Sequence, residues 1–164
     1  MLEDELSVST RERDGVAIID LVGDVTTFAE EKINSAYAQV TSQGAKHVLL
    51  NFRQNDYINS AGIAILIGIV TEVNRNNQKL GVSGLSQHFQ KIFRMVGLAQ
   101  YADIYQDENE AIKGFAPTGL EWNESNGWVS ATQLRVAPPL SHLYEYLLAS
   151  HFLVAIQARL EASA

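Results

Sequence analysis

The segment NFRQNDYINSAGIAILIGIVTE, residues 51–72, decides the fold of this chain. An apolar run over residues 48–52 leads into it and predicts a buried central strand. A polar, turn-forming loop over 54–59 follows, and Ser60 then stands where a helix N-cap is expected. The next apolar residues recur at helical spacing, so one face of the predicted helix is directed toward a core. These residues are Ile63, Leu66, Ile67, Val70 and Val73.

Ser60 is the first candidate for chemistry. In isolation, a serine at this point of a strand-loop-helix unit is more often an ordinary cap than a functional group. A cap position is partly exposed and lies at the positive end of the helix dipole, which suits a phosphate. The small residues Ala61 and Gly62 leave the junction open, so a kinase active site can approach the hydroxyl.

The side of this helix opposite its core face is expected to carry a second feature. Small and apolar residues gather there, namely Ala61, Ile65, Gly68 and Ile69, beside Glu72 and Asn76. An outward apolar patch indicates a docking surface for a partner. The alternative is that another segment of the chain covers the patch, and the C-terminal helix described below is the obvious candidate.

Composition excludes several classes of function. The 164 residues fit one domain with an appendage, and 46% hydrophobic with 19% charged residues is typical of a soluble globular protein. A net charge of −7 argues against nucleic acid as a partner, because phosphate binding needs clustered Lys and Arg. The absence of cysteine excludes disulfides and thiolate chemistry. No apolar run reaches the length of a membrane span, the acidic N-terminus lacks a signal-peptide pattern, and a cytoplasmic location is expected.

The pattern over residues 1–115 predicts one α/β domain, in which helices pack on a partly parallel sheet. Asp14-Gly15 predicts the turn of a hairpin between its first two strands. In the first helix Phe28 is expected on the apolar face with Ile33, Ala36, Tyr37 and Val40, and Thr26 or Thr27 is expected to cap it. The expected strands are 6–12, 16–22, 47–52, 80–83 and 104–105, and the expected helices are 26–44, 60–77, 86–96 and 107–115.

The rest of the chain differs in character. Residues 116–139 hold all three prolines and both tryptophans and are expected to form an irregular linker. Residues 140–164 are predicted to contain a helix that is apolar most of the way round, and such a helix must be covered. It can pack on its own domain, form a homodimer interface, bind a partner or be a non-native addition.

Three pieces of sequence together resemble a known family. They are Gly23-Asp24 after the second strand, NDYINSAGIAILIG at 55–68, and GLSQHFQKIFRMVGLAQYADIYQDENEAI at 84–112. In this order they resemble the STAS domain of anti-sigma factor antagonists, and the resemblance covers residues 6–115. It implies a mixed β-sheet with helices packed on it.

The resemblance also implies a function. Ser60 aligns with the serine that the anti-sigma factor, itself a serine kinase, phosphorylates in this family. The unphosphorylated form would bind that kinase and release a sigma factor, phosphorylation would break the complex, and a phosphatase would reset it. The residues implied as partner contacts are Asp24, Asp56, Asn59, Ala61, Gly62, Ile65 and Ile69. For Asp24 and Asp56, a turn carboxylate and a solubilising loop carboxylate are the plain alternatives.

Two residues depart from the family pattern. Asn59 stands where the family usually has aspartate, and Ala61 replaces a frequent second serine. Loss of the carboxylate is expected to weaken positioning of the kinase's nucleotide and metal. The alternative function is therefore a STAS scaffold or accessory subunit of a larger signalling or lipid-transport complex, without phosphorylation.

An enzyme is not expected. The four histidines, His47, His88, His142 and His151, have no metal-chelating spacing, so no metal or other cofactor is predicted. The chain also lacks a nucleophile elbow and a phosphate-cradling glycine loop. Any turnover that depends on Ser60 would revive the enzymatic alternative.

Overall fold

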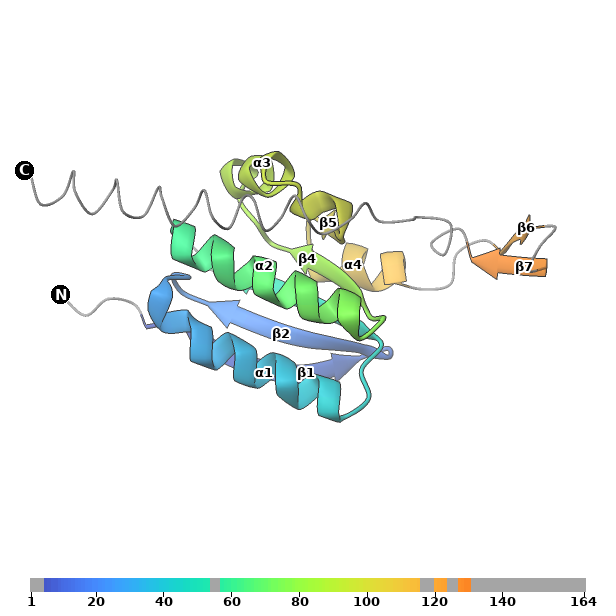
Figure 1. Cartoon of the computed structure of the whole chain (residues 1–164), viewed down its shortest axis with the longest axis horizontal. Helices are drawn as coiled ribbons and strands as arrows, with labels where there is room; N and C mark the ends of the chain where they lie inside the picture. Colours follow the sequence, from blue (N-terminus) through green and yellow to red (C-terminus); the bar gives the residue numbers. More distant parts are fainter. Residues whose placement is uncertain (1–4, 54–56, 116–119, 124–126, 131–164) are drawn as a thin grey trace, which may run out of the picture.

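A five-stranded sheet in the order β1-β2-β3-β4-β5 forms the centre of the structure (Figure 1). The structure is a computed structural model, and it describes residues 5–53, 57–115, 120–123 and 127–130. Its strands are β1 (Ser7–Arg13), β2 (Val16–Val22), β3 (His47–Arg53), β4 (Lys79–Ser83) and β5 (Ala102–Tyr105). β1 runs antiparallel to β2, and the other neighbours are parallel. The predicted mixed sheet is confirmed.

The hairpin between β1 and β2 has the predicted turn. Asp14 and Gly15 have φ angles of 52° and 77°. A two-residue type I′ turn needs positive φ at both central residues, and this Asp-Gly pair supplies it. The turn sets the register in which Arg11 lies opposite Ile18 and Ser9 opposite Asp20.

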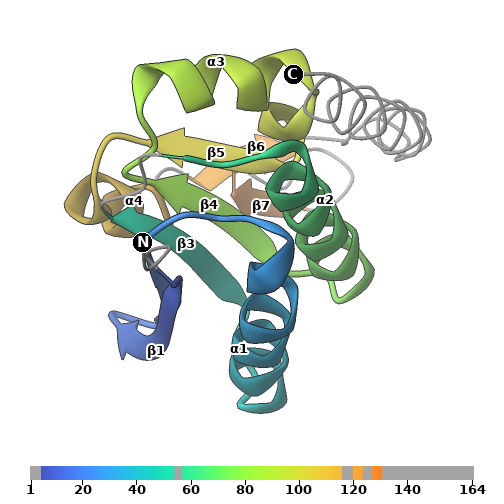
Figure 2. The same cartoon turned by 90° about the vertical axis from the view of Figure 1, so that its left-hand side faces the viewer.

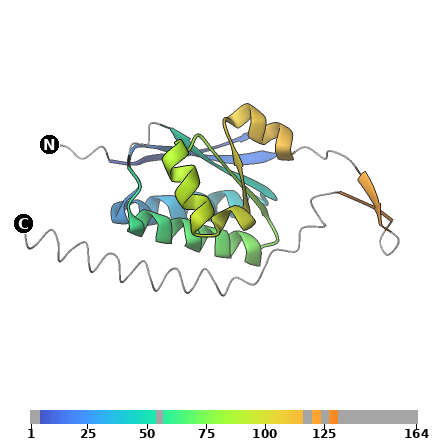
Figure 3. The same cartoon turned by 90° about the horizontal axis from the view of Figure 1, so that it is seen from above.

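Helices cover both faces of the sheet. Figures 2 and 3 show α1 and α2 on one face and α4 on the other, and Figure 2 shows α3 beside the β5 edge of the sheet. The helical elements are η1 (Thr27–Ala29), α1 (Glu30–Ser42), α2 (Ser60–Arg75), α3 (Gln87–Met95), η2 (Leu98–Gln100) and α4 (Glu108–Phe115). Because side chains alternate along each strand, neighbouring residues contribute to two different clusters.

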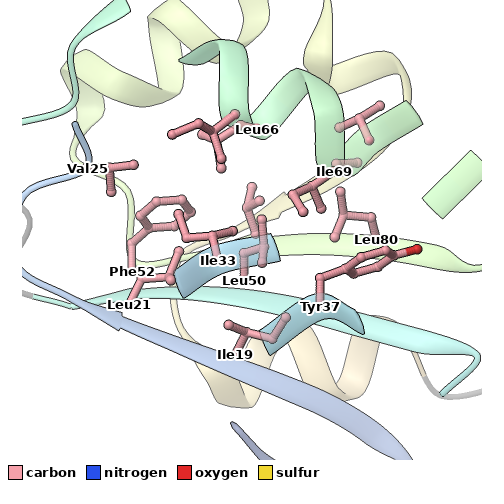
Figure 4. Close-up of a cluster of buried hydrophobic side chains, with 14 of the residues drawn as sticks. Ile19, Leu21, Val25, Ile33, Tyr37, Leu50, Phe52, Leu66, Ile69 and Leu80 are labelled. Carbon is pink, nitrogen blue, oxygen red and sulfur yellow. The ribbon is translucent and has the colours of Figure 1, made fainter. Parts of the chain in front are cut away.

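The larger cluster lies between the sheet and the helices α1 and α2 (Figure 4). Strand residues Ile19, Leu21, Leu50, Phe52 and Leu80 meet Ile33, Tyr37, Leu66 and Ile69 from the helices. Full burial of such a side chain contributes about 1.5–3 kcal/mol. The smaller cluster joins Val16, Ile18 and Leu49 to Ala111 and Phe115 of α4.

A polar network continues the α4 face of the sheet. Asp20, Asn51 and Ser83 are buried and lie side by side in β2, β3 and β4. Ser83 Oγ donates to Asn51 Oδ1 at 2.9 Å, and Asn51 Nδ2 donates to Asp20 Oδ1 at 2.7 Å. These bonds satisfy polar groups that would be costly to bury alone.

Arg11 extends this network to the edge strand and to α4. Its guanidinium donates to Asp20 Oδ2 at 2.6 Å and to both carboxylate oxygens of Glu108. Arg13 also donates to Glu108, at 2.9 Å. The hydrogen bonds from Arg11 are the main reason why the pKa of Glu108 falls to about 2. Burial raises the pKa of Asp20, but bonds from Arg11 and Asn51 outweigh it, so that pKa is lowered.

Several predicted details were wrong. α1 begins at Glu30 after a short 3-10 turn, and neither Thr26 nor Thr27 makes a side-chain cap. Phe28 therefore lies before α1 and is 82% exposed, whereas Ile33, Ala36, Tyr37 and Val40 are buried as predicted.

The segment predicted as an irregular linker contains two strands. β6 (Leu120–Asn123) and β7 (Gly127–Ser130) pair antiparallel in a separate sheet, and the register places Trp122 opposite Trp128. Aromatic residues favour strands, which outweighed the effect of the nearby prolines. The helix predicted within 140–164, and the dimer through it, lie outside the described residues.

Candidate functional site

Ser60 is the first residue of α2, and Asn59 is its N-cap. Asn59 has extended backbone angles, and its Oδ1 accepts a hydrogen bond from Gly62 N–H at 2.8 Å. The prediction that Ser60 itself caps the helix was wrong by one residue, because the asparagine before it serves at least as well in that role. Within the part of the chain that the structure describes, the partly exposed Ser60 hydroxyl has no hydrogen-bond partner.

Two loops are joined by backbone hydrogen bonds around this serine. They follow β2 and β3, whose carboxyl ends lie at the same edge of the sheet because the strands are parallel. Val25 N–H donates to the Tyr57 carbonyl at 3.0 Å, and Asn59 N–H donates to the Val25 carbonyl at 3.2 Å. The pairing of Val25 with Ile58 fixes the start of α2 against the loop that carries Asp24.

Gly62 allows the close approach of α2 to this loop. A Cβ at position 62 would lie 2.4 Å from the Val25 carbonyl oxygen and 2.9 Å from Ile58 Cγ2. No side chain can replace the glycine without displacing backbone. Gly62 is buried, so it positions Ser60 from within and is not the open contact position that the sequence suggested.

Of the two acidic residues predicted to flank Ser60, the structure describes only Asp24. Asp24 is half-buried, and its Oδ1 accepts from Tyr57 N–H at 3.1 Å, so a carboxylate is fixed in the loop joined to the Ser60 segment. Asp56 lies outside the described residues. Asn59 and Ala61 are partly exposed beside Ser60.

The outward apolar patch predicted on α2 is not exposed. Ile65 and Ile69 are only 8% and 1% exposed and belong to the larger core cluster. The buried residues of α2 occupy most of its circumference, so the helix has no opposite face at these positions. Of the four patch residues, Gly68 is exposed and Ala61 is partly exposed.

Two exposed aromatic residues were not predicted from the sequence to be functional. Phe28 is 82% exposed and Tyr57 is 46% exposed, and both line a hollow that also contains Asp24. The exposure of Tyr57 could have been predicted, since it is an aromatic residue inside a polar loop. The exposure of Phe28 could not, because its spacing from Ile33 also fits the apolar face of a helix.

Searches for other kinds of site give clear results over the described part of the chain. There, no three His, Cys, Asp or Glu side chains are grouped so that they could hold a metal ion. None of the described helices combines the length and apolar character needed to cross a bilayer.

Comparison with known proteins identifies the family of this chain. The model of the STAS domain family matches residues 7–111, and this chain belongs to that family. A relative from Staphylococcus aureus, named anti-sigma-B factor antagonist, is 19% identical over 93 residues, which cover 57% of this chain and 86% of the relative. The predicted family is thus confirmed.

Solved structures share the fold. An anti-sigma factor antagonist from Mycobacterium paratuberculosis superimposes with a TM-score of 0.60 at 15% identity, over 68% of this chain and 94% of that one. The phosphorylated form of SpoIIAA, a Bacillus cell fate determinant, gives a TM-score of 0.53 at 22% identity, over 66% and 98%. Residues 116–164 lie beyond the part that the family model matches.

Proposed function

We propose that this protein is an anti-sigma factor antagonist that binds a serine-kinase anti-sigma factor and is switched off by phosphorylation of Ser60. The observation that carries the proposal is the partly exposed Ser60 hydroxyl at the first position of α2, which has no hydrogen-bond partner among the described residues and stands beside the loop that holds Asp24. The proposal is also supported by relatives named as antagonists and by the similarity to a structure of a phosphorylated protein.

The position of Ser60 gives a physical basis for the switch. A phosphate on Ser60 would add nearly two negative charges. The amide groups at the start of α2 favour a negative charge in the free protein. In a complex the same charges would have to be desolvated against the partner, which costs much more. Phosphorylation would therefore leave the fold intact and weaken the complex.

The surface proposed to contact the kinase is smaller than the one predicted from the sequence, because three of the predicted contact residues are buried. Asp24, Asn59 and Ala61 remain as contacts because they are at least partly exposed, and Asp56 remains a candidate from the sequence. Gly62, Ile65 and Ile69 are buried: Gly62 packs against the loop that contains Val25, and Ile65 and Ile69 pack α2 on the core.

The switch implies a cycle of partners. The unmodified protein would occupy the anti-sigma factor and so free a sigma factor, the kinase would end this state, and a phosphatase would restore it. This cycle would operate in the cytoplasm. A homodimer through the predicted helix within 140–164 is a further part of the proposal.

A second candidate is favoured by one observation. The cap of α2 is the neutral amide of Asn59, where the family usually has a carboxylate. If the kinase requires that carboxylate, the domain would act as a scaffold or accessory subunit of a larger signalling or lipid-transport complex, without phosphorylation.

Variants at position 60 distinguish the two candidates. Anti-sigma factor kinases encoded in the same genome are purified, and their affinity for wild type, Ser60→Ala and Ser60→Asp is measured by calorimetry. The switch predicts that Ser60→Ala binds as wild type does, whereas Ser60→Asp binds at least tenfold more weakly. Equal affinity of Ser60→Ala and Ser60→Asp would favour the scaffold.

A further inference from the structure

Exposed apolar side chains are not spread evenly over the molecule. The described part of the chain has three large ones, Phe28, Tyr57 and Met95, at 82%, 46% and 72% exposure. Phe28 and Tyr57 line one hollow, whereas Met95 is the last residue of α3. Exposed aromatic residues that share a hollow indicate a binding surface more strongly than a lone exposed side chain does.

We call this feature the Phe28–Tyr57 hollow. It has a volume of about 480 Å³, and Leu6 and Ala29 add apolar surface to its lining. Lys32 also lines it, but its ammonium is bound to Glu5 at 2.6 Å and to the Leu6 carbonyl at 3.0 Å. The Lys32 ammonium is thus paired within the protein, so it does not make the hollow a site for an anionic partner.

The lining of the hollow also contains a carboxylate. Asp24 lines it, and its carboxylate is held by the Tyr57 amide. Glu30 and Glu31 are exposed in the first turn of α1, directly after Phe28 and Ala29. The hollow therefore combines aromatic surface with the carboxylate of Asp24, and Glu30 and Glu31 follow it in the chain.

The hollow is continuous with the Ser60 site. Tyr57 precedes Ser60 by three residues, and its carbonyl is bonded to Val25 of the loop that leads to Phe28. A stable protein–protein interface covers about 800 Å² of each partner. A protein that covers Ser60 over such an area can extend over Tyr57 to the hollow.

We infer that the Phe28–Tyr57 hollow is the anchoring site for the anti-sigma factor kinase, and that it receives an apolar side chain of the kinase flanked by Lys or Arg. This inference rests on the proposed function and adds to it. Aromatic residues are enriched among the few that dominate binding energy, and the Asp24 carboxylate in the lining complements a cation on the partner. In this proposal the hollow contributes most of the binding energy, and phosphorylation of Ser60 determines whether the kinase binds.

The test uses the full chain and a purified anti-sigma factor kinase that binds it. Affinities are measured for wild type, Phe28→Ala, Tyr57→Ala and Met95→Ala, each checked for its folded circular dichroism spectrum. Met95→Ala is the matched control, because it removes a similarly exposed apolar side chain away from the hollow. We expect Phe28→Ala and Tyr57→Ala each to weaken binding about tenfold or more, and Met95→Ala to change it less than twofold.

The outcomes separate this inference from the proposed function. If Ser60→Asp abolishes binding but Phe28→Ala and Tyr57→Ala bind like wild type, the anchor is overturned and the switch stands. If Met95→Ala weakens binding as much as the other two, the effect is not local and the anchor is also overturned. If the kinase tested as a Ser60 partner does not bind wild type, the proposed function itself has failed.

The charge of the partner is tested in the same assay. Association of wild type should slow markedly between 50 and 500 mM NaCl, because screening weakens the attraction between cations on the partner and the carboxylates of this protein, Asp24 in the hollow included. An Asp24→Asn variant, whose Oδ1 can still accept from Tyr57 N–H, should reduce that salt dependence. An association rate that is independent of salt would overturn the cationic part of the inference.

Discussion

Replacing Glu108 by glutamine should destabilise the fold measurably, although Glu108 is the first residue of α4 and is partly exposed. Its carboxylate accepts hydrogen bonds from both Arg11 and Arg13, which are 97 and 95 residues away in the chain. The Glu108→Gln variant keeps the size of the side chain and removes its charge. It therefore tests how strongly the ion pairs hold α4 to the edge strand β1.

The magnitude follows from the pKa of Glu108. The folded protein lowers this pKa from 4.5 to about 2, a difference of about 2.5 units. At 1.36 kcal/mol per unit, about 3 kcal/mol is the upper limit of the stabilisation. The Glu108 side chain is 22% exposed and that of Arg11 is 38% exposed, so solvent screening reduces this value. We expect a loss of about 1–2 kcal/mol at pH 7.

The dependence on pH has a defined sign. Because the pKa is lower in the folded state, the stabilisation is fully present above about pH 4.5 and is lost as the pH falls toward 2. Urea unfolding of wild type and Glu108→Gln should therefore show a difference at pH 7 that disappears near pH 2. Glu12→Gln is the control, since Glu12 makes no ion pair within the described residues. A Glu108→Gln variant as stable as Glu12→Gln at pH 7 would refute the argument.

Two further variants test the start of α2. Asn59→Ala should lower the free energy of unfolding by about 1 kcal/mol, because Gly62 N–H loses its cap, whereas Asn59→Asp should keep the cap; equal stability of all three proteins in urea would contradict this. Gly62→Ala should cost about 1–3 kcal/mol despite the higher helix propensity of alanine, because its Cβ would meet the Val25 carbonyl at 2.4 Å. Gly68→Ala, at an exposed position where a Cβ meets nothing within 4 Å, is the control and should be neutral or stabilising; a Gly62→Ala variant that is no less stable would contradict the packing argument.

Local patterns in the sequence were sufficient for the fold. The alternation of apolar runs with helical periodicity predicted the strands and helices of residues 6–115, and Asp14-Gly15 predicted the first turn. These features depend on residues close together in the chain, so the sequence carries them directly. The same holds for the family, whose motif at 55–68 is one continuous segment.

Details that depend on tertiary contacts were not predictable. Asn59 and Ser60 are both good caps, and the choice between them depends on the backbone bonds to Val25. A helical wheel also assumes one buried face, so the sequence left open whether Ile65 and Ile69 are exposed or covered, and the structure shows that both are buried on a helix that is buried around most of its circumference. The Asp20–Asn51–Ser83 network joins residues from three strands, and its only local sign was an aspartate in the apolar run VAIIDLV.

The central claim is that phosphate on Ser60 controls binding. The most direct measurement is the affinity of one anti-sigma factor kinase for this protein with serine and with phosphoserine at position 60, confirmed by mass spectrometry. The account predicts tight binding of the serine form, at least tenfold weaker binding of the phosphoserine form, and return of binding after phosphatase treatment. Equal affinity of the two forms, with the phosphate mapped to Ser60, would contradict it.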